Sequence, residues 1–157
     1  TNDGAFVWAD RTDADVGSWG ADTVTFRCNG GVRFQNTSTS LYAKWSPGDG
    51  NWVVVSDQNL KENVAPVDSK AVLEKVAALP IAEWNYKGYG QRNIGPMAQD
   101  FHELFPFEGS TETSLNAGHL DGVALAAIQG LYQENQELKK KLEEVAQTLA
   151  ALQKQGL

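Results

Sequence analysis

Residues 128–152 read IQGLYQENQELKKKLEEVAQTLAAL. Branched apolar side chains recur in this stretch at alternating intervals of three and four residues, which is the heptad pattern of a coiled coil. The a and d positions of this pattern are Ile128, Leu131, Asn135, Leu138, Leu142, Val145, Leu149 and Leu152. A lone helix would leave this apolar stripe in water, so we expect partner helices to cover it.

One polar residue, Asn135, occupies an a position of this stripe. A buried asparagine at such a position fixes the register of the helices and lowers their stability. The other a and d residues do not define the number of helices, because isoleucine with leucine favours two and Leu142 with Val145 favours more. The alternative is a helix that folds back on its own domain, but the stripe continues as far as residue 152.

Residues 1–55 differ in character, with many glycine, threonine, asparagine and serine residues and four of the five tryptophans. Short apolar runs separated by turn residues predict strands. These runs are residues 5–9, 23–28, 32–34, 41–45 and 52–55. The turn signal Asn29-Gly30-Gly31 suggests a hairpin between the second and third runs.

Sheets of such short strands bury little apolar area on their own. Identical chains that wrap around one another would supply the missing contacts, and we expect the tryptophans to lie between subunits. Two alternatives remain open for residues 1–55. They are a small monomeric sandwich and a tryptophan-rich surface that binds a carbohydrate.

The middle of the chain predicts mixed structure. A helix over residues 68–79 has Asp68 or Ser69 as its cap and Pro80 after its end. Residues 81–86 alternate as a strand does, and residues 96–105 carry an apolar helical face that begins at a proline. The polar, glycine-containing residues 107–120 indicate a loop.

Composition excludes several classes of function. A net charge of −7 argues against general binding of nucleic acid, and no apolar run approaches the length of about 18 residues that spans a bilayer. The single cysteine, Cys28, leaves no pair for an internal disulfide and no cysteine-based zinc site. His102 and His119 are the only histidines and have no ligand cluster around them, so we expect no metal and no cofactor.

Between the two halves lies the octet Ser56-Asp57-Gln58-Asn59-Leu60-Lys61-Glu62-Asn63. Two interpretations are open from these residues alone. Asn59 with Glu62 resembles a capping box, which predicts a turn at Ser56 and a solvated lysine on a helix. Alternatively, Ser56 is a nucleophile and Lys61 is the base that takes its proton, provided that burial lowers the pKa of the lysine from its ordinary value of about 10.4.

Three blocks of sequence together resemble a known family. They are residues 56–63, residues 94–100 followed by Phe105-Pro106, and Leu120-Asp121-Gly122-Val123-Ala124 at the start of the heptads. In this order and spacing they resemble the C-terminal intramolecular chaperone domain of phage endosialidases, tail spikes and tail fibres. The resemblance covers about residues 55–157, and residues 1–55 are more loosely similar to the Gly-rich repeats that often precede this domain.

The resemblance implies a homotrimer that helps an upstream β-fibre segment of the same chain to fold in register and then cuts itself off. It assigns Ser56 as the catalytic nucleophile and Lys61 as the general base. The bond between Ser56 and Asp57 would be cut, with Val55–Ser56 as the alternative, and His102 is a possible auxiliary in proton transfer. The domain would belong to a virion tail fibre or spike, or to a bacterial surface protein.

The sequence therefore predicts an α+β fold in three parts. Residues 1–55 form a β-rich stalk, residues 56–120 a small mixed chaperone domain and residues 121–157 a parallel coiled coil. The leading hypothesis is a trimeric, self-cleaving intramolecular chaperone. The alternatives are a trimerisation tip that never cuts, and a fibre tip that binds a receptor or carbohydrate.

Overall fold

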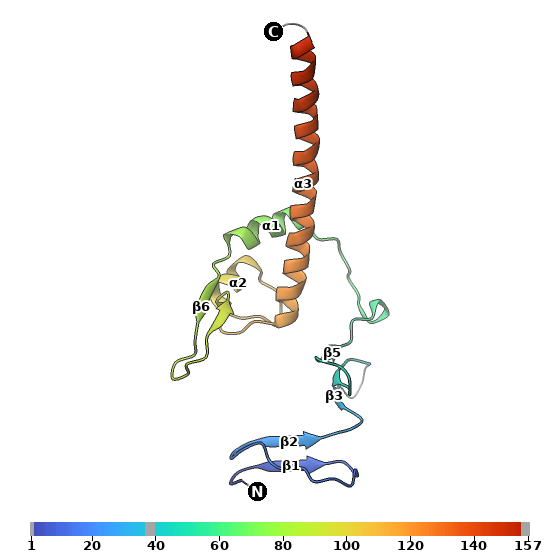
Figure 1. Ribbon diagram of the computed structural model, residues 1–157, viewed down its shortest axis with the longest axis vertical. Helices are drawn as coiled ribbons and strands as arrows, with labels where there is room; N and C mark the ends of the chain where they lie inside the picture. The colour runs from blue at the N-terminus through green and yellow to red at the C-terminus, as the bar shows by residue number, and fades with distance from the viewer. Residues whose placement is uncertain (1, 37–39, 155–157) are drawn as a thin grey trace. The chain divides into compact units, whose positions relative to one another are not determined.

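A computed structural model describes residues 2–36 and 40–154 of the chain (Figure 1). The described residues form a mixed α+β structure with small sheets and a long C-terminal helix, which confirms the predicted class. The chain divides into two compact units, residues 1–64 and residues 65–157. In the part of the chain that the structure describes, no helix is long and apolar enough to cross a membrane.

The first unit begins with two parallel strands, β1 (Phe6–Ala9) and β2 (Val24–Arg27), in which Phe6 lies beside Val24. The Arg27 guanidinium holds the long connection between them. It donates to the carbonyl oxygens of Thr12, at 2.8 Å, and Ala14, and its Nε lies 3.4 Å from the Asp10 carboxylate. The connection is therefore fastened to the strand that follows it.

Three antiparallel strands complete the sheets of this unit. They are β3 (Val32–Gln35), β4 (Tyr42–Trp45) and β5 (Val53–Val54), in the order β3-β4-β5. The predicted hairpin at Asn29-Gly30-Gly31 is wrong, because this turn connects β2 to β3 in a different sheet. Gly31 has a φ of +94°, and a Cβ there would lie 2.3 Å from the Trp45 carbonyl oxygen. The glycine thus lets the chain approach β4 closely.

No described residue of the first unit is buried. Phe6 of β1 and Phe26 of β2 remain 54% and 57% exposed in the single chain. Their rings contact each other edge to face at 5.9 Å between centroids. The unit therefore has aromatic pairs but no enclosed core of its own.

The second unit is built on its last helix. The elements are α1 (Ser69–Ala78), β6 (Ala82–Trp84), β7 (Asn93–Gly95), α2 (Ala98–Leu104) and α3 (Ala117–Lys154). Figure 1 shows α1, α2 and the β6–β7 hairpin grouped beside the N-terminal part of α3. The buried apolar cluster is formed by Phe101 and Phe105 with Val123 of α3.

The helix boundaries follow local capping. Asp68 caps α1 as predicted, and its carboxylate accepts the backbone N–H groups of Lys70 and Ala71 at 3.1 and 3.2 Å. The predicted loop over residues 107–120 is wrong at its end, because α3 already begins at Ala117. The Asn116 side chain accepts the N–H of Gly118 at 2.9 Å, which satisfies a donor of the first turn.

Helix α3 has two apolar faces with different surroundings. Val123, Ala127 and Gly130 are buried on the face that packs against α1. The apolar a and d residues lie on another face, where exposed fractions run from 43% at Leu152 to 69% at Leu142. In the described chain, the rest of the second unit does not cover the stripe, so partner helices over it stay a prediction.

Candidate active site

A short turn brings the two predicted catalytic residues together. Residues Gln58–Leu60 form the 3₁₀ turn η1, in which the N–H of Leu60 donates to the Asp57 carbonyl and that of Lys61 to the Gln58 carbonyl, both at 3.1 Å. Lys61 leaves the turn with extended backbone angles, φ −114° and ψ 145°. Its side chain thereby returns towards Ser56.

The Lys61 Nζ atom donates a hydrogen bond to Ser56 Oγ at 2.6 Å. Sequence reasoning predicted the pair, and the structure places the two groups within the reach that proton transfer requires. Both side chains are exposed in the single chain. A lysine must lose its proton before it can act as a base, and burial away from water is the usual means. The geometry of the pair is therefore present, whereas burial is not.

The turn is capped by Asp57, and this differs from the capping box expected at Asn59 and Glu62. The Asp57 Oδ1 atom accepts the backbone N–H of Asn59 at 2.9 Å and the Asn59 side-chain amide at 3.0 Å. No helix begins at Asn59, because the backbone is extended again at Lys61. Sequence reasoning missed Asp57 as a cap, although aspartate side chains often accept the backbone N–H two residues further on.

His102, the predicted auxiliary, lies on α2 in the second unit. Its Nδ1 atom is buried and has no hydrogen-bond partner among the described residues. Ser56 and Lys61 belong to the first unit. A role of His102 in their chemistry therefore stays a prediction.

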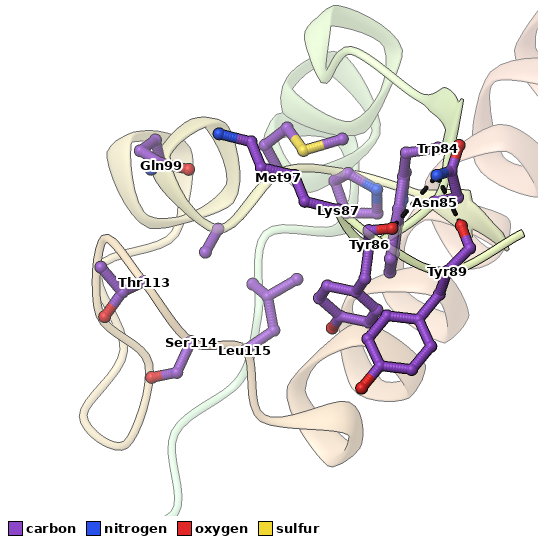
Figure 2. Close-up of a pocket in the computed structure, with 12 residues that line it drawn as sticks. Trp84, Asn85, Tyr86, Lys87, Tyr89, Met97, Gln99, Thr113, Ser114 and Leu115 are labelled. Atoms are coloured by element: carbon purple, nitrogen blue, oxygen red, sulfur yellow. Dashed lines mark hydrogen bonds between the residues drawn. The ribbon is translucent and has the colours of Figure 1, made fainter.

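A groove of about 1000 Å³ in the second unit is a separate candidate site (Figure 2). Its walls come from the β6–β7 hairpin, the start of α2 and the loop before α3. The lining includes Trp84, Tyr86, Lys87, Tyr89, Met97, Gln99 and Leu115. The Trp84 Nε1 atom is buried and finds no acceptor in the described chain, whereas the tyrosine side chains are exposed.

The hairpin that forms this groove is held by its own polar contacts. The Asn85 amide donates to the carbonyl oxygens of Tyr86 and Tyr89 at 3.1 and 2.8 Å, as the dashed lines in Figure 2 show. Arg92, which directly precedes β7, pairs with Glu83 of β6 at 3.1 Å. The structure gives Arg92 a bracing role within the hairpin.

The four tryptophans of the first unit each expose more than a third of their surface, and Trp19 is 90% exposed. Trp52 packs against Phe34 with 5.7 Å between ring centroids. These rings are available to a partner subunit or to a ligand. The two interpretations made from the sequence both stay predictions.

Comparison with known proteins covers the serine–lysine pair and part of the second unit. Residues 56–110 match the family described as chaperone of endosialidase. The match begins at Ser56 and includes Lys61, the hairpin and α2, whereas the block at 120–124 and all of α3 lie beyond it. A search of curated proteins finds no match to the chain. The resemblance inferred from the sequence is thus confirmed for residues 56–110, which are similar to the chaperone-of-endosialidase family.

Proposed function

We propose that the chain is an intramolecular chaperone that brings three copies together, aligns the upstream β segment and then cuts itself at Ser56. The observation that carries this proposal is the 2.6 Å contact between Lys61 Nζ and Ser56 Oγ at the first residues of the family match. A serine beside a lysine is a known form of activated nucleophile.

Two features of the single chain support assembly into a homotrimer. The first unit has no buried residue among those described, so its strands require further contacts. The a and d stripe of α3 is exposed, and a parallel coiled coil would bury it. Both surfaces would be covered by the same event, which would link folding of the upstream segment to pairing of the helices.

The chemistry of the cut depends on which bond beside Ser56 breaks. We place the cut at Ser56–Asp57, with Val55–Ser56 as the alternative. Attack of Ser56 Oγ on the Val55 carbonyl carbon passes through a five-membered ring, breaks the C–N bond and leaves an ester that water then hydrolyses. At Ser56–Asp57 the same oxygen would need a four-membered ring, so this cut requires the hydroxyl of a neighbouring copy or an activated water.

Lys61 has the same task at either bond. In its neutral form it removes the proton from the attacking oxygen, and in its protonated form it returns a proton to the departing amine. Packing of three copies around the exposed pair would remove water from the lysine and favour the neutral form. Cleavage would then follow assembly rather than precede it.

The decisive experiment compares the wild type with Ser56→Ala and Lys61→Arg, reading fragment masses and native mass in the same samples. Arginine keeps the positive charge but does not release its proton at ordinary pH, so it isolates the role of the base. We expect trimers in all three proteins and fragments in the wild type alone. The fragment masses also assign the bond, because the N-terminal piece ends at Val55 or at Ser56.

Other outcomes favour the alternative functions. A wild-type trimer that keeps only its intact mass near 17.1 kDa per chain would indicate a trimerisation tip without protease activity. A monomer would contradict the chaperone assembly. The high exposure of Trp19 supports the third alternative, a carbohydrate-binding tip. Glycan binding by the full chain that is lost in Trp19→Ala would favour it.

A further inference from the structure

We propose that Asp57 is a positioning residue for the serine–lysine pair, because its carboxylate caps the turn that holds Lys61 against Ser56. The catalytic meaning of this inference rests on the proposed function. The claim that Asp57 stabilises the turn is independent of the proposed function, since it concerns only the folded chain. Neither the family match nor the resemblance of the octet assigns such a role to Asp57.

The turn between Ser56 and Lys61 must close a long distance. Five residues of extended chain span about 17 Å, so an extended octet would hold Ser56 and Lys61 far apart. In the structure the two side chains are in contact, because the backbone bonds of Leu60 and Lys61 close the 3₁₀ turn between them. The pair therefore exists only while this turn is formed.

Few contacts other than those of Asp57 hold the turn. The polar contacts of residues 56–63 in the described chain are all made within residues 56–61. A turn of three residues has poor intrinsic stability, and its early N–H groups need acceptors. The Asp57 carboxylate supplies the acceptor for the N–H of Asn59 at 2.9 Å and also binds the Asn59 amide.

Asp57 could affect cleavage in a second way besides capping the turn. Asp57 flanks the bond proposed to break, so its replacement could alter cleavage through the leaving group alone. A proline at position 58 resolves this ambiguity. The N–H of Gln58 donates to no described residue, and Asp57 has the extended angles, φ −68° and ψ 128°, that a residue before proline adopts. Proline at this first position would preorganise the turn without the carboxylate.

The test measures the rate of self-cleavage in the full chain for Asp57→Asn, Asp57→Ala and the double variant Asp57→Ala with Gln58→Pro. Asparagine keeps the acceptor oxygen, so we expect a rate near that of the wild type. Alanine removes it, and loss of a cap of this kind lowers the rate about fivefold. The double variant is expected to recover most of the loss. If Asp57→Ala slowed cleavage only through the leaving group, the proline at position 58 would not restore the rate.

Asp49→Ala is the matched control. Asp49 accepts the N–H of Ser46, three residues before it, at 3.2 Å in another turn of the same unit, so this variant removes a different aspartate–backbone hydrogen bond. We expect no change in its cleavage rate. A loss equal to that of Asp57→Ala would overturn the inference, since it would reflect general weakening of the unit.

A structural measurement keeps the inference independent of cleavage. In a Ser56→Ala background, which would stay intact, nuclear Overhauser effects between residues 57 and 60 report the turn. We expect them with aspartate or asparagine at position 57, weakened with alanine and restored by proline at 58. Nuclear Overhauser effects that are equally strong with alanine and with aspartate at position 57 would overturn the inference. Absence of cleavage in the wild type together with these expected signals overturns only the proposed function.

Discussion

Gly130 of α3 lies directly against the backbone carbonyl of Ser69, at the start of α1. A Cβ atom at Gly130 would lie 2.2 Å from that oxygen and 3.0 Å from the Leu73 side chain. The absence of a side chain is what allows the two helices to approach this closely. Nearby, the Ser69 hydroxyl donates to the Gln129 side chain at 3.3 Å, and Lys70 pairs with Glu137.

Gly130→Ala is therefore expected to lower the free energy of unfolding. The added carbon meets backbone atoms that cannot rotate away, so α1 must shift, at a cost of about 1–3 kcal/mol. Urea denaturation at fixed protein concentration measures the change, since concentration affects an oligomer's apparent stability. Equal stability of Gly130→Ala and wild type would contradict the close helix contact.

Gly122→Ala provides the matched control on the same helix. A Cβ at Gly122 has nothing within 4 Å, so alanine adds no clash. Alanine inside a helix is more favourable than glycine by roughly 0.5–1 kcal/mol. We expect this variant to be slightly more stable than the wild type. The opposite signs of the two substitutions would establish that packing against α1, rather than helix propensity, decides the result at Gly130.

The second prediction concerns the heptad stripe. Leu138→Asp places a charge at a d position that is 63% exposed in the single chain. If partner helices cover this position, the charge must be buried without a partner, and the trimer should dissociate. Gln136→Asp changes the charge equally at a nearby position outside the stripe and should keep the trimer. Native mass spectrometry measures the oligomeric state of both variants. A trimeric Leu138→Asp protein would show that α3 does not mediate assembly.

The third prediction links assembly to cleavage. If burial between copies is what neutralises Lys61, the monomeric Leu138→Asp protein should keep its intact mass although Ser56 and Lys61 are unchanged. Incubation of this variant over a period in which the wild type is fully cut, followed by intact mass measurement, tests the link. Complete cleavage in the monomer would mean that the exposed pair is active by itself.

Sequence reasoning succeeded where the signal was local or periodic. The heptads marked α3, and Asp68 marked the start of α1. Each of these features depends on residues within a few positions of one another. The residue types there were sufficient to predict the geometry.

Sequence reasoning failed where strand pairing or competing caps decided the result. The turn at Asn29-Gly30-Gly31 has hairpin chemistry, yet β2 pairs in parallel with β1, which is distant in sequence. In the octet two residues could cap a turn, and Asp57 does so instead of Asn59. The groove beside Trp84 is lined both by the hairpin and by residues 113–115. No local sequence pattern predicts that these two segments lie close together.

The last prediction concerns acid stability of the first unit. The Asp10 carboxylate accepts the N–H of Asn29 at 2.6 Å and that of Thr12 at 3.2 Å, and it lies beside Arg27. These contacts favour the charged form, and the hydrogen bond from Asn29 is the main reason that the pKa of Asp10 is lowered. Asp10 thus contributes stability above the unfolded-state pKa of about 3.9, and this contribution is lost as the pH falls through the lower folded-state value.

We therefore expect the first unit to weaken below about pH 4 in the wild type and less so in Asp10→Asn, whose amide does not titrate in this range. Urea denaturation followed by tryptophan fluorescence at pH 6 and pH 3 compares the two proteins, because four of the five tryptophans lie in this unit. The carboxyl carbon shift of Asp10 gives a direct check. A titration midpoint at or above about 3.9 would contradict the hydrogen bonds to Asn29 and Thr12, since each of them stabilises the charged carboxylate.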